Sequence, residues 1–365
     1  MKKTTLKRIG QSLFVGASLL LLLIDLSPTQ LSTSESPENY IEAEVTVVSG
    51  TESTQELELI TEEGAIISAT NSLDSYSNAK EYFVDDKVVL LEFQEQFFVM
   101  DHVRRPALIV LFCLFVGLVL IVNRAKGLYS LLSMSFSFLV LFKLVLPLLL
   151  QGVDPILSAL LGSLLILPAI FYLSHGFNRK TSIAMLGTLI TLGITGLLAN
   201  VFTELSELSG LASEEAGFLQ IGIGENINFK GLLLAGMIIS ILGVLDDVTI
   251  TQTSVVEQLK ASKKNIHFDE LYRRSMAVGK DHISSVINTL ILVYTGASLP
   301  LMLLFMDSSQ SVGQLLNLEF MAEEIVRTLI GSMGLILAVP ITTLLASFVY
   351  SKAKKSVQVM GIIIK

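Results

Sequence analysis

Long apolar runs separated by short polar segments dominate the chain from Pro106 onward. A transmembrane helix needs about 20 mostly apolar residues, with a range of about 17–25. Most of the runs fit this length, and a shorter one, from Phe14 to Leu26, lies near the N-terminus. The predicted spans are 14–26, 106–122, 128–150, 154–174, 182–204, 230–249, 283–306 and 325–350. This pattern predicts a polytopic α-helical membrane protein with about eight transmembrane helices.

Residues 27–103 follow a different pattern, polar and acidic, with apolar positions that alternate. Ile41, Ala43, Val45 and Val47 alternate with polar side chains, and the same period of two recurs later in the segment. An alternation of this kind is typical of half-buried β-strands. We therefore expect a small β-rich domain of four to six strands, in a barrel or a sandwich, on the extracytoplasmic side.

The N-terminus is either a cleaved signal peptide or an uncleaved membrane anchor. Basic residues precede its apolar run, as both alternatives require. No clear small-x-small cleavage site follows Leu26, which favours the anchor. The expected organisation is an anchor over 1–26, the β-rich domain over 27–103 and a seven-helix membrane domain over 104–365.

Loop charges indicate the orientation of the spans. Basic residues gather in alternate loops and acidic residues in the others, and short cytoplasmic loops are enriched in Lys and Arg. The basic group comprises Arg124, Lys126, Arg179, Lys180, Lys260, Lys263, Lys264, Arg273, Arg274, Lys352, Lys354 and Lys355. This alternation predicts that both termini lie in the cytoplasm and that residues 27–103 lie outside.

Composition supports the membrane assignment and limits the chemistry. The chain is 52% hydrophobic and only 16% charged, against about 25% charged residues in an average soluble domain. Its single cysteine, Cys113, rules out an intramolecular disulfide framework, and four scattered histidines give no zinc spacing. No cofactor, metal or nucleic-acid motif and no Ser-His-Asp or Cys-His arrangement is visible, so we expect a non-enzymatic protein whose main partner is the lipid bilayer.

Polar residues concentrate in the predicted sixth and seventh spans. Asp246 and Asp247 end the sixth span, and acids at membrane depth usually face protein or water. Their spacing from Ser240 and Gly243 predicts that Asp247 faces inward and that Asp246 lies on a neighbouring face. Polar positions recur near the start of the seventh span and roughly along one of its faces. The expected ion or proton pathway between the two spans comprises Asp246, Asp247, Lys280, Asp281, His282, Ser285 and Asn288.

A plainer interpretation of the same residues stays open. Asp246 and Asp247 can mark a solvated end of the span, and Lys280 can extend to the interface. Hydrogen bonds between Ser, Thr and Asn are also common between packed membrane helices.

Several motifs resemble the YibE/F family of bacterial membrane proteins. They are the segments 243–257, from Gly-Val-Leu-Asp-Asp to Glu257, and 272–290, with Gly296-Ala-Ser298 after it, together with Val103–Ala107, Ser174–Gly176 and Ser209–Glu215. The resemblance covers most of the chain and implies a multi-pass protein of the cell membrane. It implies topology more than activity.

A fainter similarity concerns the layout of protein-export and RND-type transporters. There, a Gly-x-x-Asp-Asp helix is followed by a polar span, and intramembrane acids carry protons. That likeness implies Asp247 as the proton-carrying acid and Lys280 as its basic partner. The chain departs from those transporters because it lacks large domains between spans and a second half-repeat. A homo-oligomer or a partner subunit would then complete the machinery.

Two functions remain open at this stage. The first is an ion-gradient-linked transporter or permease component with its pathway between the sixth and seventh spans. The second is a membrane scaffold whose β-domain binds a ligand or an envelope partner. An intramembrane enzyme is a third and weaker hypothesis, and neither the substrate nor the coupling ion follows from the sequence.

Overall fold

A computed structural model describes residues 39–362, apart from 52–53, 73–79, 94–95, 224–226 and 308–310. The described chain divides at Arg124 into a unit that contains all its strands and a unit of helices. The predicted N-terminal span over 14–26 lies outside the described residues, as does the end of the chain.

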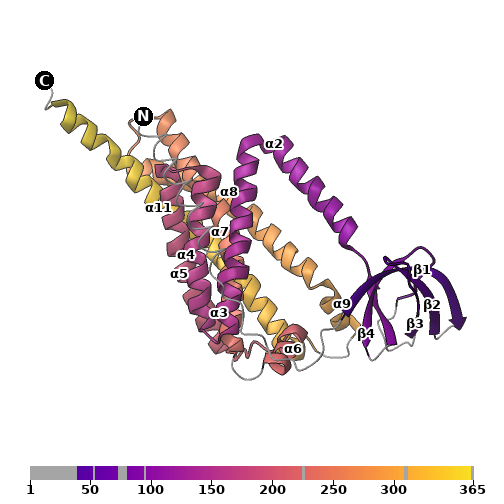
Figure 1. The fold of residues 1–365 in the computed structure, drawn as a ribbon. Helices are drawn as coiled ribbons and strands as arrows, with labels where there is room; N and C mark the ends of the chain where they lie inside the picture. The colour runs from indigo at the N-terminus through magenta and orange to yellow at the C-terminus, as the bar shows by residue number, and fades with distance from the viewer. Residues whose placement is uncertain are drawn as a thin grey trace. The chain divides into compact units, whose positions relative to one another are not determined.

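Five strands close into a barrel in the first unit (Figure 1). They are β1 (Asn39–Thr51), β2 (Thr54–Thr61), β3 (Ile66–Ser72), β4 (Lys87–Phe93) and β5 (Gln96–His102). Their order around the barrel is β1-β2-β3-β5-β4, with every pair antiparallel except β3 and β5. Strands thus lie where the period-two alternation predicts them.

The barrel interior is filled by the apolar side of that alternation. Val45, Leu59, Val88 and Leu90 are completely buried. A bulge in the pairing of β1 with β2 then shifts the register after Val45 and leaves Val47 on the surface. An extra residue in one strand reverses the side to which later side chains point, and the sequence pattern alone does not show it.

A break at Arg124 interrupts the first long helical segment. α2 (Arg105–Val140), the π-helical turn η1 (Leu141–Val145) and α3 (Leu146–Leu150) form one run of 46 residues. At Arg124 the backbone leaves the helical region, with φ 49° and ψ −129°. A straight helix of this length would measure about 69 Å, more than twice the hydrocarbon thickness of about 30 Å. The break therefore lies where the sequence separates the spans 106–122 and 128–150.

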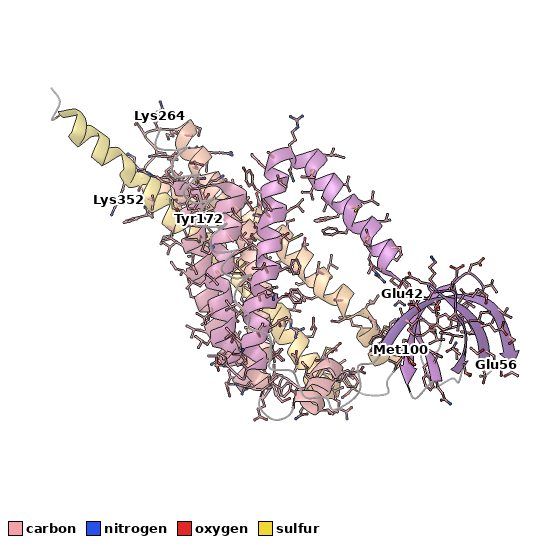
Figure 2. All side chains as sticks on the ribbon, viewed as in Figure 1. Glu42, Glu56, Met100, Tyr172, Lys264 and Lys352 are labelled. Atoms are coloured by element: carbon pink, nitrogen blue, oxygen red, sulfur yellow. The ribbon has the colours of Figure 1, made fainter. Side chains whose placement is uncertain are left out.

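The helical unit packs its remaining long helices side by side. These are α4 (Pro155–His175), α5 (Arg179–Leu205), α7 (Phe229–Ser262), α8 (Phe268–Ala297) and α11 (Glu319–Ile362). Three short helices, α6 (Glu214–Ile223), α9 (Leu299–Asp307) and α10 (Val312–Leu316), join them. The α4–α5 turn, beside Tyr172, lies at the same end of this unit as Lys264 and Lys352, whereas α6 lies at the opposite end (Figures 1 and 2).

Five helical segments of the described chain are long and apolar enough to cross a membrane. They are Arg105–Leu150, Pro155–His175, Arg179–Leu205, Phe229–Ser262 and Glu319–Lys352. The chain is thus a helical membrane protein, as predicted. The count of eight spans stays a prediction, because the first segment is long enough for two crossings and the N-terminal run is not described.

The predicted seventh span has the wrong bounds. Instead of one apolar helix over 283–306, the structure has the more polar α8, which starts at Phe268, followed by α9. α8 is not among the five apolar segments. It still connects the two ends of the unit, because α7 ends near Lys264 while α11 begins at the other end. There Glu319 accepts hydrogen bonds from the backbone N–H groups of Ser209 and Gly210, in the α5–α6 connection.

The barrel carries an acid-sensitive ion-pair cluster at the end of β5. Asp101 accepts hydrogen bonds from Arg104 at 2.6 and 2.7 Å and from Lys80 at 2.8 Å. These cations, with Arg104 the stronger, hold the pKa of Asp101 well below its usual range. A lowered pKa in the folded state stabilises the fold above the ordinary carboxylate pKa, and this stabilisation is lost as pH falls.

We expect Asp101→Asn to weaken the barrel at neutral pH and to reduce its loss of stability in acid. The measurement is hydrogen–deuterium exchange at β4 and β5 of the full chain, corrected for intrinsic rates, from pH 7 to pH 3. Asp85→Asn, an exposed turn variant, is the control. Identical acid profiles for the wild type and Asp101→Asn would contradict the assignment.

Candidate functional site

The acidic pair lies on α7, the helix that packs against α4, α5, α8 and α11. Asp246 is half-buried and Asp247 is exposed, so the prediction that Asp247 faces inward is wrong. The shared face is right, because Ser240, Gly243 and Asp247 are all exposed along one side of α7. No ion pair joins either carboxylate to a cation within the described residues.

α8 keeps most of its polar side chains on the outside. Lys280, Asp281, Ser285 and Asn288 are exposed, and His282 is half-buried. The opposite side of α8 packs inward through Leu271, Ser275, Gly279 and Leu290. A helix that connects the two ends of the membrane unit therefore presents a polar surface away from its own neighbours.

Gln252 fixes α7 against α8 and α11. This fully buried side chain donates from Nε2 to the carbonyl of Ser275 at 3.0 Å and to Oγ1 of Thr343 at 2.7 Å. Gly279 makes the approach possible, because a Cβ there would lie 2.9 Å from Gln252 Nε2. One amide group thus connects three helices in the core.

The Gln252–Ser275 contact also sets the depth of the predicted pathway residues. Asp247 lies five positions from Gln252, and Lys280 lies five positions from Ser275, both toward the end that holds α6. At 1.5 Å per residue each lies about 7.5 Å from the contact. The structure thus brings the acidic pair and the Lys280–His282 group to one level on neighbouring helices, without direct bonds between them.

A hydrogen-bonded turn follows α4. Asn178 accepts a hydrogen bond from the Thr181 N–H at 2.9 Å and donates to the His175 carbonyl at 2.9 Å. Gly176 has φ 78°, a conformation that favours glycine. The turn thus fixes the end of α4 at His175, within the Ser174–Gly176 motif that the sequence analysis singled out.

Buried hydroxyl groups surround the Gln252 contact. Thr188 of α5 and Thr249 of α7 pair through their hydroxyl oxygens at 2.8 Å, and both are completely buried. Thr249 also donates to the backbone carbonyl of Asp246 at 3.2 Å. Sequence reasoning missed these residues because isolated threonines in an apolar helix do not show which side faces the core.

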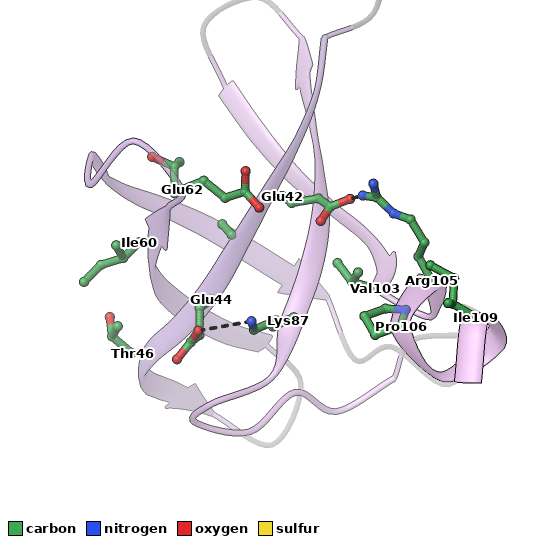
Figure 3. A pocket seen from close by; sticks show the side chains of 12 residues that line it. Glu42, Glu44, Thr46, Ile60, Glu62, Lys87, Val103, Arg105, Pro106 and Ile109 are labelled. Carbon is green, nitrogen blue, oxygen red and sulfur yellow. Dashed lines mark hydrogen bonds and ion pairs between the residues drawn. The ribbon is translucent and has the colours of Figure 1, made fainter. Parts of the chain in front are cut away.

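A separate cavity of about 540 Å³ lies in the first unit, where the barrel meets the start of α2 (Figure 3). Glu42 pairs with Arg105, and Glu44 lies 4.0 Å from Lys87. Glu62 lines the same cavity, and Ile109 contributes an apolar wall from α2. The sequence predicted a binding role for the β-domain but none of these residues.

Within the described residues, no three His, Cys, Asp or Glu side chains are arranged to hold a metal ion.

A family model described as YibE/F-like protein matches residues 111–352. No curated protein and no solved structure matches the chain.

Gln252→Leu should destabilise the helical unit, because it removes two hydrogen bonds from a buried site. We expect a loss of about 1–3 kcal/mol, the usual range when buried polar partners lose a hydrogen bond. The measurement is the unfolding free energy of the purified protein in detergent. Gln258→Leu, an exposed position on the same helix, is the control; an equal loss in both variants would exclude the proposed connection.

Proposed function

The chain belongs to the YibE/F-like family, whose model covers most of its helical unit, and we propose that it is an ion-gradient-linked transporter or permease component of a cell membrane. The α7–α8 pair is its ion-coupling part. The role is non-enzymatic and needs no cofactor. The single observation that carries the proposal is the polar outer face of α8, a helix that connects the two ends of a membrane unit.

Hydrocarbon does not tolerate such a face. Asp and Lys at the centre of a bilayer cost about 2.5–3.5 kcal/mol each on insertion scales, and they usually face a bundle interior or a water-filled cavity. α8 exposes Lys280, Asp281, Ser285 and Asn288 over about two helical turns. A pathway for ions or protons gives these groups the polar surroundings that lipid lacks.

The acidic pair supports the same function. Asp246 and Asp247 lie at the level of Lys280 and His282, on the neighbouring helix α8. Histidine changes its charge near neutral pH, and carboxylates and histidines on neighbouring helices are the usual components of proton relays.

The proposed topology keeps both termini in the cytoplasm and residues 27–103 outside. The end of the helical unit that holds Lys264 and Lys352 is then the inner end, in agreement with the enrichment of Lys and Arg in short cytoplasmic loops. A second copy or a partner subunit completes the polar surface that the described residues leave open on α8.

Gradient-driven flux in reconstituted vesicles tests the proposal. The double variant Asp246→Asn/Asp247→Asn removes both charges with little change in shape, and we expect it to abolish flux. Asp269→Asn, an exposed acid in the first turn of α8, should retain flux. Flux at the wild-type level in the double variant would refute the pathway.

The barrel cavity favours a second candidate function. Its lining combines carboxylates and hydroxyl groups from the strands with Pro106 and Ile109 from α2. Such a mixture of apolar walls and a few polar groups is typical of small-molecule sites. In this alternative the barrel binds a ligand or an envelope partner, and the helices only hold it in the membrane.

Removal of residues 38–100 separates the two functions. If the helices carry out transport, we expect the shortened chain to retain gradient-driven flux, because no predicted pathway residue lies in the deleted segment. The flux of the shortened chain is compared with that of the Asp246→Asn/Asp247→Asn variant, measured in vesicles of the same composition. Loss of the activity on deletion, with the acids dispensable, would favour the scaffold.

A further inference from the structure

A row of buried threonines follows one side of α5. Thr181, Thr188, Thr191, Thr195 and Thr203 are all completely buried. At 1.5 Å per residue the row extends about 33 Å, close to the hydrocarbon thickness of about 30 Å. Hydroxyl groups therefore recur along the whole membrane depth of this helix, on the side that packs against α7 and α11.

Part of this row has ordinary hydrogen bonds. Thr191 donates to the carbonyl of Gly187, and Thr195 donates to that of Thr191, both at 2.8 Å. Bonds from a hydroxyl to the carbonyl one turn earlier are common in helices and carry no function by themselves.

Four other buried hydroxyls have no such partner among the described residues. They belong to Ser275, Thr342, Ser347 and Thr203, and each residue is completely buried. Thr342 of α11 directs its hydroxyl at the α5 row, because a Cβ on Gly187 would lie only 2.6 Å from its Oγ1. A buried polar group without a hydrogen bond is costly, so each of these hydroxyls needs a small polar ligand.

We propose that water molecules bind these four hydroxyls and, with the α5 threonines, form a proton path through the core between α5, α7, α8 and α11. This inference deepens the proposed transport function, on which it rests, by naming the proton as the coupling ion. In each transfer an oxygen lone pair accepts a proton from one neighbour, and the same oxygen releases its own hydrogen to the next. No bond order or oxidation state changes along the path.

The path begins at Asp246. Thr249, three positions after this half-buried acid, pairs with Thr188 of the α5 row, and its hydroxyl donates to the backbone carbonyl of Asp246. The Asp246 carboxyl accepts from the Asp247 N–H at 2.8 Å. The proposed path starts at this carboxyl because Asp246 is the half-buried member of the acidic pair, while Asp247 lies on the open side. A dehydrated metal cation fits this core poorly, because none of its named hydroxyl groups carries a compensating charge.

Proton flux into vesicles that contain the full chain, followed with a trapped pH dye, tests the path. We expect Thr342→Val and Ser347→Ala each to lower flux at least tenfold, and Thr342→Ser, which retains the hydroxyl, to restore it. Ser163→Ala is the matched control, because Ser163 is a buried serine of α4 that bonds to Ala159 outside the row. Wild-type flux in Thr342→Val would overturn the path.

Water-edited solid-state NMR measures hydration without reference to transport. We expect water magnetisation to reach Thr342 and Thr203 about as fast as exposed Thr251, and to reach the directly bonded Thr253 more slowly. Slow transfer to Thr342 and Thr203 would overturn the inference.

The outcomes for the proton path and for the transport function can be told apart. If flux of another ion depends on Asp246 and Asp247 but protons do not move, the inference fails and the proposed function stands. Hydrated hydroxyls in a chain without any acid-dependent flux would refute the transport function and, with it, the proton path.

Discussion

Hydrocarbon offers no hydrogen-bond partners, and this constraint governs the whole helical unit. Every polar group at membrane depth must find a partner within the protein, in water or in another chain. The core meets this demand through Gln252, which bonds to α8 and α11, and through the Thr188–Thr249 pair between α5 and α7. These bonds require the helices to pack closely, and glycine residues at the contacts allow this because they have no side chain. A side chain at Gly279 would collide with Gln252, and one at Gly334 would lie 2.9 Å from the Thr195 hydroxyl.

The same constraint divides α7 into two sides with different roles. The inner side carries Thr249, Gln252 and Thr253, which are bonded and buried. The outer side carries Gly236, Ser240, Gly243 and Asp247, which are exposed among the described residues. Asp246 lies between the two sides. In the proposed path Asp246 therefore stands between the open surface and the buried hydroxyls, whereas Asp247 lies on the open surface.

The sequence predicted what depends on local pattern. Hydropathy located most of the long helices, and alternation located the strands but not the reversal of sides after Val45. A basic residue between two apolar runs also predicted the break at Arg124. Features that depend on tertiary packing were not predictable. The bulge that exposes Val47 arises from strand pairing, and the choice of Asp246 over Asp247 depends on where α4 and α5 lie around α7. A helix beginning near Phe268 was predicted, but not that it continues without a break into the seventh span, because its first turns are polar and only its inner side is apolar.

Burial decides which polar groups can be functional. Bonds such as Thr195 to Thr191 satisfy a hydroxyl locally, so they are compatible with a purely structural core. An unbonded hydroxyl in the same core is different, because replacement by valine or alanine would keep the packing without the cost of an unmet hydrogen bond. Thr342, Ser347 and Ser275 lie within two or three turns of the Gln252 contact, where such costs accumulate. The proposed hydration would supply the hydrogen bonds that these hydroxyls lack among the described residues, and the proposed path would join them to Asp246.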